Sequence, residues 1–430
     1  MKQLAGRTTV IASLGVLVVL IVSRYLVNPL NLNNVFHTDI PLDLWIYMRG
    51  GERVTAGANL YEGNIFNDLP FTYPPFAGII FAWVSALDDA SVTAIWHTTT
   101  AASVIVVVWL CLRRMRIDVN PMSFLLILPL LAAFFLFGTE PLHATLFWGQ
   151  INVVLMLLVC LDFLPLKYRL PGIGVGLAAG VKLTPAFFGI LFLIQRRWWA
   201  AAGSFLTFLV TVLLGFVVVP DAKAFWTDAI FKSSRVGDHL NPGAQSLKSV
   251  LVRNLGIESD STWLLLLLAA VVVCAFAAWL AVRLDCMPVA VGVTGYGACL
   301  VSPFTWYHHW VWIVPVGVAV FAAANGAAAR FADGNPVRWQ FAGLLSVGAM
   351  IAVCAPFVAA NVGAGLLWEY HPERGFTWMY VPGAVAFLAG FILYALLELR
   401  KKEILSRRRW LREQKDWLRF QRAERLGQLG

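Results

Sequence analysis

The stretch WLLLLLAAVVVCAFAAWLAV, from Trp263 to Val282, decides the fold class because it runs for twenty residues without a charge. A helix needs about 20 mostly apolar residues to cross a lipid bilayer. The rest of the chain has the same character: of 430 residues, 59% are hydrophobic and only 13% are charged. A soluble protein has about 25% charged residues. The composition therefore predicts an all-α polytopic membrane protein and excludes a disordered chain, a disulfide scaffold and a nucleic-acid-binding domain.

Apolar runs of similar length recur along the chain, and each is a candidate membrane span. With the first run, Thr8–Ser23, they predict ten crossings. A hairpin at Leu170–Ile194, with Lys182 near its apex, would raise the number to about twelve, and we expect Pro74–Leu87 to be re-entrant or juxtamembrane. The other uncharged runs are Ser91–Leu112, Pro121–Thr139, Pro141–Leu161, Trp198–Pro220, Cys286–Tyr307, Trp310–Ala329, Trp339–Trp368 and Gly375–Leu397.

Basic residues predict the orientation, because short loops rich in Lys and Arg stay in the cytoplasm. This rule places the N-terminus, the basic turns at 113–116, 167–169 and 196–197, Arg283, Arg330 and the C-terminal tail inside. The opposite side then receives five segments, which we call the outer loops: Leu30–Tyr73, Thr139–Gln150, Asp221–Ser261, Ser302–His309 and Gly363–Arg374.

The excess positive charge lies in the tail. The formal net charge is +9, and residues 400–430 hold eleven Lys or Arg against four Asp or Glu. We therefore divide the chain into a multi-span domain, 1–399, and a basic tail, 400–430. Trp410, Leu411, Trp417 and Leu418 recur at helical spacing in the tail. This pattern fits an amphipathic helix on the anionic cytoplasmic leaflet, and a solvated charged tail is the alternative.

Two carboxylates follow the first span. Asp39 and Asp43 would share one face of a helix, since residues four apart are neighbours there. An acid at the membrane surface can act as a general base if a hydroxyl substrate reaches it. Asp39, close to Pro41, could instead serve as a local turn or cap residue. Asp43 stands among apolar and aromatic residues, which favours a buried functional role.

Three further polar groups lie within or beside apolar runs. Glu140 precedes a turn that leads to Gln150 and Asn152, whose amides need hydrogen-bond partners and could bind a polar substrate or bridge helices. Lys182 interrupts an apolar segment near Pro185. An intramembrane lysine is a functional hypothesis, and a phosphate is a natural partner for its charge; snorkelling to the interface is the alternative.

The outer loops Asp221–Ser261 and Ser302–His309 carry cations and hydroxyls. Arg235 precedes the pair Gln245 and Ser246, and the adjacent His308 and His309 lie in the turn after Ser302. Adjacent histidines point in different directions on a helix, so they do not form a metal-binding i, i+4 pair. The six cysteines form no CxxC motif. We therefore expect no metal, and a histidine that donates to an anion or orients a carboxylate, or one that is merely interfacial.

The ordered set of these motifs resembles glycosyltransferase family 87, a group of C-class, polyprenyl-phosphate-sugar-dependent enzymes of actinobacteria, over nearly the whole chain. Each motif alone is weak. The motifs are Asp43-Leu44-x-x-Tyr47, Phe71-x-Tyr73-x-Pro75, Glu140-Pro141 with Gly149-Gln150-x-Asn152, Lys182-x-x-Pro185, Gln245-Ser246-Leu247, and Ser302-Pro303 with Trp306-x-His308-His309-Trp310.

The resemblance implies a function and a location. It implies a multi-pass enzyme of the plasma (inner) membrane, with its active site on the periplasmic face. Such an enzyme transfers mannose from polyprenyl-phosphate-mannose to a phosphatidylinositol mannoside, lipomannan or lipoarabinomannan acceptor. The product linkage is α-(1→2), and the transfer inverts the donor's β configuration. No cofactor is implied. An arabinofuranosyltransferase of related architecture and a lipid-linked sugar transporter remain alternatives.

The resemblance also assigns roles to residues. It makes Asp43 the catalytic base and gives a catalytic role to His308 or His309, between which the motif does not decide. Many C-class enzymes carry Asp-Asp or Asp-x-Asp in the first outer loop. The wider spacing of Asp39 and Asp43 departs from that pattern and favours a base that works without a metal. The expected substrate-binding residues are Asp39, Tyr47, Glu140, Gln150, Asn152, Lys182, Arg235, Gln245 and Ser246.

Overall fold

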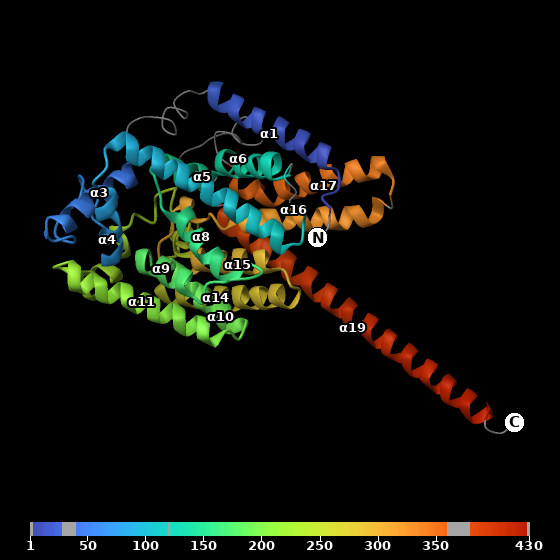
Figure 1. The fold of residues 1–430 in the computed structure, drawn as a ribbon. Helices are drawn as coiled ribbons and strands as arrows, with labels where there is room; N and C mark the ends of the chain where they lie inside the picture. Colours follow the sequence, from blue (N-terminus) through green and yellow to red (C-terminus); the bar gives the residue numbers. More distant parts are fainter. Residues whose placement is uncertain are drawn as a thin grey trace.

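The computed structural model describes residues 3–27, 40–118, 121, 123–332, 334–358 and 379–427. Within these ranges the chain is helical and its only strand-like pairings are isolated bridges, which confirms the all-α prediction (Figure 1). The helices are α1 (Arg7–Val27), α3 (Leu42–Thr55), α4 (Pro75–Val84), α5 (Asp89–Arg114), η1 (Ser123–Ile127), α6 (Leu128–Gly138), α7 (Glu140–Trp148), α8 (Asn152–Phe163), α9 (Ile173–Val181), η2 (Thr184–Phe188), α10 (Gly189–Ile194), α11 (Trp198–Val218), α12 (Ala222–Thr227), η3 (Ala229–Phe231), η4 (Ser233–Arg235), α13 (Leu247–Leu255), α14 (Asp260–Arg283), α15 (Met287–Val301), η5 (Tyr307–His309), α16 (Ile313–Ala332), α17 (Pro336–Cys354), η6 (Ala355–Phe357) and α19 (Tyr380–Gly427).

Six of the described helices are long and apolar enough to cross a membrane: α5, α11, α14, α16, α17 and the first part of α19. Another six apolar helices within the same residues are shorter, among them α4, α8 and α15. Large apolar side chains on α11 and α14 point outward; Val217 is 83% exposed and Leu265 is 69% exposed. Apolar surface of this extent suits a lipid solvent rather than water. The multi-span architecture is thus confirmed, and ten to twelve crossings remain a prediction.

Two predicted apolar runs are broken. Pro141–Leu161 is not one helix: α7 ends at Trp148, and Gly149 adopts a left-handed conformation with φ 70° before α8 begins at Asn152. Glycine takes this conformation without the penalty that a Cβ imposes, so the apolar count alone could not show the break. The interruption at Lys182 is confirmed, because this residue is extended between α9 and η2.

The segment around Lys182 forms the predicted hairpin. Its two ends meet, since the Arg197 Nη2 donates a hydrogen bond of 3.3 Å to the carbonyl of Leu170. At the entry to this segment, the Asp162 carboxylate accepts hydrogen bonds from the backbone N–H groups of Gly172 and Val175 at 2.8 and 2.7 Å. The chain therefore enters and leaves at one end of the bundle and carries Lys182 away from that end.

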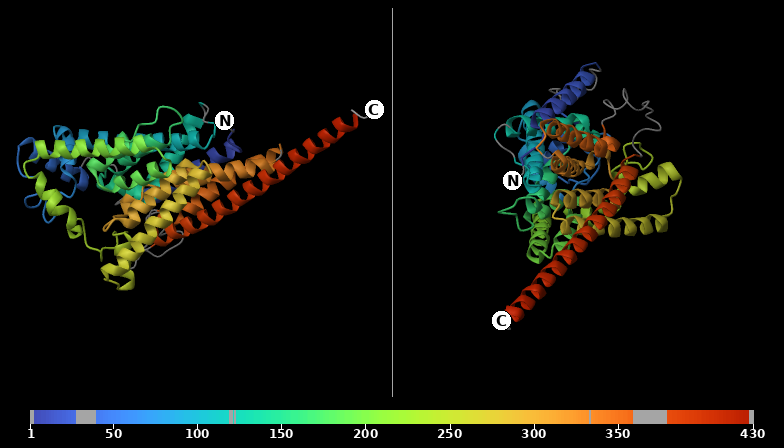
Figure 2. Two further views of the ribbon diagram at one scale, coloured as in Figure 1. Left: turned by 90° about the horizontal axis from the view of Figure 1, so that it is seen from below. Right: turned by 90° about the vertical axis from the view of Figure 1, so that its right-hand side faces the viewer.

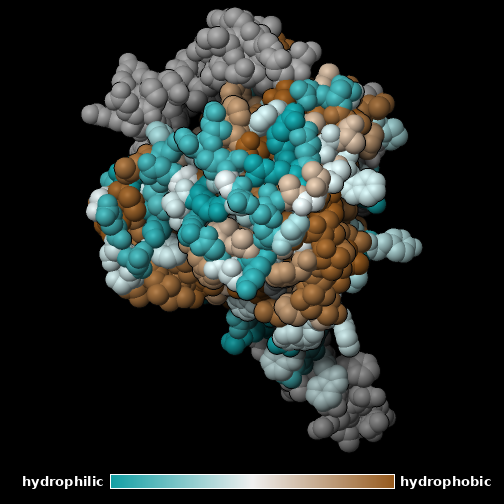
Figure 3. All heavy atoms as spheres, turned by 90° about the vertical axis from the view of Figure 1, so that its left-hand side faces the viewer, coloured by the Kyte–Doolittle hydropathy of each residue, from teal (hydrophilic) through white to brown (hydrophobic). Residues whose placement is uncertain are grey.

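Predicted outer loops contact one another at the opposite end of the bundle. The Asp221 carboxylate accepts hydrogen bonds from the backbone N–H groups of Leu60 and Tyr61 at 2.8 and 2.6 Å, and Trp148 Nε1 donates to the Tyr307 hydroxyl at 2.7 Å. The face that carries α3 and α4 is hydrophilic over much of its area and is flanked by apolar surface (Figure 3). The described parts of the loops predicted on the outer side thus lie at one polar end of the molecule.

Helix α19 leaves the bundle at the other end. Its first part packs against α14, and the helix then extends well beyond the neighbouring helices (Figures 1 and 2). It runs from Tyr380 to Gly427 without a break at residue 400. The tail therefore begins inside a continuous helix, and the division into 1–399 and 400–430 remains a prediction. Asp39 and the predicted outer loop 363–374 lie outside the described residues.

Candidate active site

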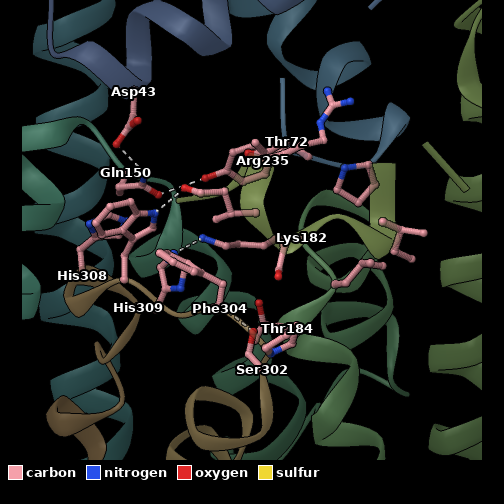
Figure 4. A pocket seen from close by; sticks show the side chains of 18 of the residues that line it. Asp43, Thr72, Gln150, Lys182, Thr184, Arg235, Ser302, Phe304, His308 and His309 are labelled. Carbon is pink, nitrogen blue, oxygen red and sulfur yellow. Dashed lines mark hydrogen bonds between the residues drawn. The ribbon is translucent and has the colours of Figure 1, made fainter. Parts of the chain in front are cut away.

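A cavity of about 660 Å³ lies at the polar end of the bundle, where the outer loops meet. Its walls come from α3, the segment before α4, the turn after α7, the break after α9, the 225–236 segment and the 301–309 turn. Figure 4 shows side chains from these segments directed toward a common space. Among the predicted site residues, seven line this cavity: Asp43, Tyr47, Gln150, Lys182, Arg235, His308 and His309.

Asp43 lies in the first turn of α3, which begins after Pro41. The partial positive charge at a helix N-terminus favours a carboxylate there. Its Oδ2 accepts a hydrogen bond of 2.5 Å from Gln150 Nε2. Burial raises the pKa of Asp43 to about 6, although the hydrogen bond from Gln150 and the charge of Lys182 act in the opposite direction. A carboxylate with this pKa is ionised at neutral pH and basic enough to take a proton.

The turn at Gly149 places Gln150 beside Asp43. A Cβ on Gly149 would lie 2.7 Å from the Cβ of Leu44 and 2.9 Å from the Cβ of Pro41. Only glycine allows α7 to approach the start of α3 this closely. The φ of 70° therefore serves two purposes: it ends α7, and it directs the next side chain at the carboxylate.

Two tyrosines surround the same amide. The hydroxyls of Tyr47 and Tyr73 form a hydrogen bond of 2.7 Å with each other, and both lie within hydrogen-bond distance, 3.1 Å, of the acceptor Gln150 Oε1. Tyr47 also stacks on Phe81 with ring centroids 4.2 Å apart. Burial raises the pKa of both phenols above the ordinary value, so both stay protonated at neutral pH and can donate. They hold the Gln150 side chain in one orientation.

Lys182 occupies the break between two helical pieces and reaches back toward α8. Its Nζ donates a hydrogen bond of 2.8 Å to Asn152 Oδ1 and lies 2.8 Å from His309 Nε2. It also lies 5.3 Å from the centre of the Tyr73 ring. Asn152 does not line the main cavity; its Nδ2 donates to the His308 carbonyl at 3.0 Å and to Gln150 Oε1 at 3.3 Å.

The structure separates the two histidines. His309 Nε2 faces the Lys182 ammonium, whereas neither ring nitrogen of His308 has a hydrogen-bond partner among the described residues, although both are buried. Burial and the charge of Lys182 lower the pKa of both imidazoles well below the usual range. Both rings are therefore neutral. His308 has a donor and an acceptor available for a ligand.

Arg235 projects into the cavity from η4, on the side away from Asp43 (Figure 4). Its Nη2 lies 3.5 Å from the carbonyl of Phe71, and its buried Nε has no hydrogen-bond partner within the described ranges. A guanidinium offers five N–H donors in a planar fork that matches phosphate oxygens. This side chain can therefore bind an anion without first breaking an ion pair.

Besides Asn152, three predicted substrate-binding residues in the described part of the chain do not line the cavity. Glu140 lies at the start of α7. Gln245 Nε2 donates to the Pro242 carbonyl at 3.0 Å, while Ser246 caps α13 and donates to the Pro303 carbonyl at 3.1 Å. Both Gln245 and Ser246 are fully buried. The hydrogen bond from Ser246 holds α13 against the 301–309 turn, whose Pro303 lines the cavity.

Several cavity residues were missed as candidates because aromatic residues are common in membrane proteins. Trp148, Trp306 and Tyr307 line the cavity beside the histidines, and an aromatic face suits the apolar face of a sugar ring. These residues are close in the sequence to Gly149 or to the histidine pair, and this position could have identified them as candidates. Thr184 and Ser302 also line the cavity. Both stand within motifs quoted above, but neither hydroxyl was selected as a site residue.

The fold and the cavity define a polytopic membrane protein with an acid and several cations at one polar end. Residues 71–303 match the family model described as glycosyltransferase family 87. This match covers more than half of the chain, and the chain belongs to that family. No solved structure is a significant match to it.

Curated relatives come from mycobacteria. The chain is 34% identical over 284 residues to the polyprenol-phosphate-mannose-dependent alpha-(1-2)-phosphatidylinositol pentamannoside mannosyltransferase of Mycobacterium tuberculosis, and 35% identical over 285 residues to the protein of the same name in Mycolicibacterium smegmatis. These matches cover 64% of this chain and 65% and 68% of the relatives. A phosphatidylinositol mannoside mannosyltransferase of Mycolicibacterium smegmatis is 33% identical over 315 residues. The chain thus spans about two thirds of the relatives' length.

Proposed function

We propose that this protein transfers mannose from polyprenyl-phosphate-mannose to a mannose of a phosphatidylinositol mannoside or related glycolipid. The new bond would be α-(1→2), formed with inversion at the outer face of the plasma membrane. The observation that carries the proposal is the Asp43 carboxylate at the wall of a cavity that also holds Lys182 and Arg235. The names of the relatives supply the donor and the class of acceptor.

The reaction requires one displacement. The acceptor hydroxyl oxygen forms a bond to the anomeric carbon while the bond from that carbon to the phosphate oxygen breaks. Asp43 takes the hydroxyl proton, and the electron pair of the broken bond leaves with the lipid phosphate. An inverting transfer needs the base on the face opposite the leaving group. Asp43 and Arg235 lie on different sides of the cavity (Figure 4), which supports this assignment of base and phosphate contact.

The cavity lining suits the other parts of both substrates. A lipid phosphate leaves without an acid if positive charge stabilises it, which Arg235 offers. Neutral His308 can donate to and accept from sugar hydroxyls. Phe187, Phe225 and Ile230 contribute apolar surface to the same cavity, where the first units of a polyprenyl chain would be in contact with them.

The test is mannosyl transfer by the full-length chain. Membranes containing the protein are incubated with radiolabelled polyprenyl-phosphate-mannose and individual phosphatidylinositol mannosides, and the product is digested with an α-(1→2)-specific mannosidase. We expect a labelled glycolipid from which the mannosidase releases labelled mannose. With Asp43→Asn we expect no labelled glycolipid.

Other products would contradict parts of the proposal. Transfer from a polyprenyl-phosphate arabinofuranose donor alone would identify a pentosyltransferase. Movement of the lipid-linked sugar across the bilayer without transfer would identify a transporter. A mannosylated product that resists the mannosidase would leave the donor correct and the linkage wrong.

A further inference from the structure

A continuous chain of hydrogen bonds joins Lys182 to Asp43. Lys182 Nζ donates to Asn152 Oδ1 at 2.8 Å, and Asn152 Nδ2 donates to Gln150 Oε1 at 3.3 Å. Gln150 Nε2 then donates to Asp43 Oδ2 at 2.5 Å. The four residues come from three separate parts of the chain, and two amides stand between a cation and an anion.

The chemistry of the two ends dictates how both amides are oriented. An ammonium only donates, so the Asn152 atom that faces Lys182 is the oxygen. Its nitrogen then faces Gln150 and the His308 carbonyl, which only accepts. The oxygen of Gln150 faces that nitrogen and the two tyrosine hydroxyls, and its nitrogen faces the carboxylate. Every donor in the chain therefore points toward Asp43.

We infer that Lys182, Asn152 and Gln150 are positioning residues that keep Asp43 ionised and aimed at the acceptor hydroxyl, so that the charge of Lys182 serves the base rather than the donor phosphate. The inference rests on the proposed function. Aligned amide dipoles polarise one another in a low-dielectric site and carry the influence of the cation to the carboxylate.

The surroundings of Lys182 support this role over phosphate binding. Two of its three N–H donors are directed at Asn152 Oδ1 and His309 Nε2, and the Tyr73 ring lies on another side. A phosphate that reached the ammonium would have to displace one of these partners. The Nε–H of Arg235 has no hydrogen-bond partner within the described residues. We therefore assign the phosphate of the sugar donor to Arg235.

Other titratable groups line the cavity with Asp43, and they differ in what they do below pH 8. Burial raises the pKa of the phenols of Tyr47 and Tyr73, which keep their protons there. Lys232 forms a 2.5 Å ion pair with Asp228.

The histidines and Lys182 are further titratable groups of the cavity. Burial and the charge of Lys182 hold the pKa of His308 and His309 well below the usual range. Burial lowers the pKa of Lys182 to about 7, so its ammonium is protonated at pH 6, where the Asp43 carboxyl changes its charge.

The experiment compares the acid side of the pH–rate profile for mannosyl transfer by the full-length enzyme in nanodiscs. Lys182→Met removes the charge and keeps most of the side-chain volume. Loss of a nearby opposite charge raises a carboxyl pKa by about one unit or more, so the acid limb should move up by about one pH unit while the Michaelis constant for the donor changes little. Lys182→Arg, which keeps the charge, should restore part of the shift.

Lys248→Met is the matched control. Lys248 pairs with Asp260 at 2.9 Å, away from the cavity, so its removal should leave the acid limb in place. If Lys182→Met does not fold, Asn152→Leu decides instead, because it removes the amide between Lys182 and Gln150 without adding a charge and should also move the limb upward.

Three results would overturn the inference. An unmoved limb in active Lys182→Met, together with a tenfold or larger rise in the donor Michaelis constant, would make Lys182 a phosphate contact. An unmoved limb in Asn152→Leu would show that no relay reaches Asp43. If the wild-type enzyme transfers no mannose, the proposed function fails and the relay fails with it.

Discussion

Gln150 donates a hydrogen bond of 2.5 Å to Asp43, although the two residues are 107 positions apart in the chain. The bond joins the first outer loop to the turn after α7. It orients one carboxylate oxygen, Oδ2, of a side chain that lines the cavity. Because the amide also accepts from two tyrosines, its rotation would break several hydrogen bonds at once. The position of the base is therefore set before a substrate arrives.

Replacement of Asp43 by asparagine should abolish transfer and preserve the fold. Asparagine keeps the shape but cannot accept the hydroxyl proton, and removal of a general base costs about 10²–10⁴ in rate. Because burial disfavours the ionised carboxylate, the neutral variant should have an equal or higher unfolding temperature at pH 7. Activity and thermal unfolding of Asp43→Asn, measured on the same preparation, check both statements.

Two controls accompany this variant. Asp68→Asn alters an exposed carboxylate that does not line the cavity, and it should transfer mannose normally. Asp39→Asn should also retain most of its activity, as a turn or cap residue would. A dead Asp39→Asn beside a fully active Asp43→Asn would reassign the base to Asp39.

The rate should fall as the pH decreases through about 6. Burial raises the pKa of Asp43 to about 6 from the ordinary 3.8, so the carboxyl becomes protonated, and useless as a base, at a higher pH than an exposed aspartate. Above pH 7 the Asp43 carboxyl is ionised, and its protonation no longer limits the rate. The measurement is kcat/KM for the donor from pH 4.5 to 8. A plateau that extends to pH 4.5 would rule out a base with this pKa.

Most residues of the candidate site could be predicted from the sequence, but the contacts between these residues could not. Asp43, Gln150 and Lys182 were recognisable because polar side chains beside apolar runs need partners. Their mutual contacts were not predictable, because they depend on the Gly149 turn and on the break at Lys182, where backbone conformation rather than composition decides. The misassigned helix across residues 141–161 has the same origin. Gln245 and Ser246 belong to one of the motifs that predicted the site, but they lie behind the cavity wall and do not line the cavity.

Replacement of Arg235 should weaken use of the donor. A charge-assisted contact to phosphate contributes about 1.5–3 kcal/mol, which corresponds to roughly 10- to 150-fold in affinity. Arg235→Gln should therefore raise the Michaelis constant for polyprenyl-phosphate-mannose and leave that for the acceptor nearly unchanged. Lys223→Gln, on the exposed side of α12, is the matched control. Equal donor titrations for both variants would remove Arg235 from the phosphate site.

The basic tail should contact anionic lipid. Trp410 and Trp417 are 56% and 58% exposed on α19, seven residues apart and surrounded by arginines. A cysteine at position 410 that carries an environment-sensitive dye should show a blue shift in nanodiscs with anionic lipid and little in neutral ones, and about 0.5 M salt should reduce it. Equal spectra in both lipids would favour a solvated tail.

External cysteine reagents should label the cavity end of the molecule and not the tail. The outer loops gather at the end that carries α3 and α4, and α19 leaves at the other (Figure 1). Basic loops remain cytoplasmic, which places the cavity outside. Five of the six native cysteines are buried and Cys286 is partly exposed. A Cys286→Ser variant should therefore show little labelling of its remaining native cysteines. In intact cells, a membrane-impermeant maleimide should label a cysteine at position 68 or 223 but reach one at position 410 only after permeabilisation. Labelling of position 410 alone in intact cells would reverse the orientation and place the cavity, with Asp43, in the cytoplasm.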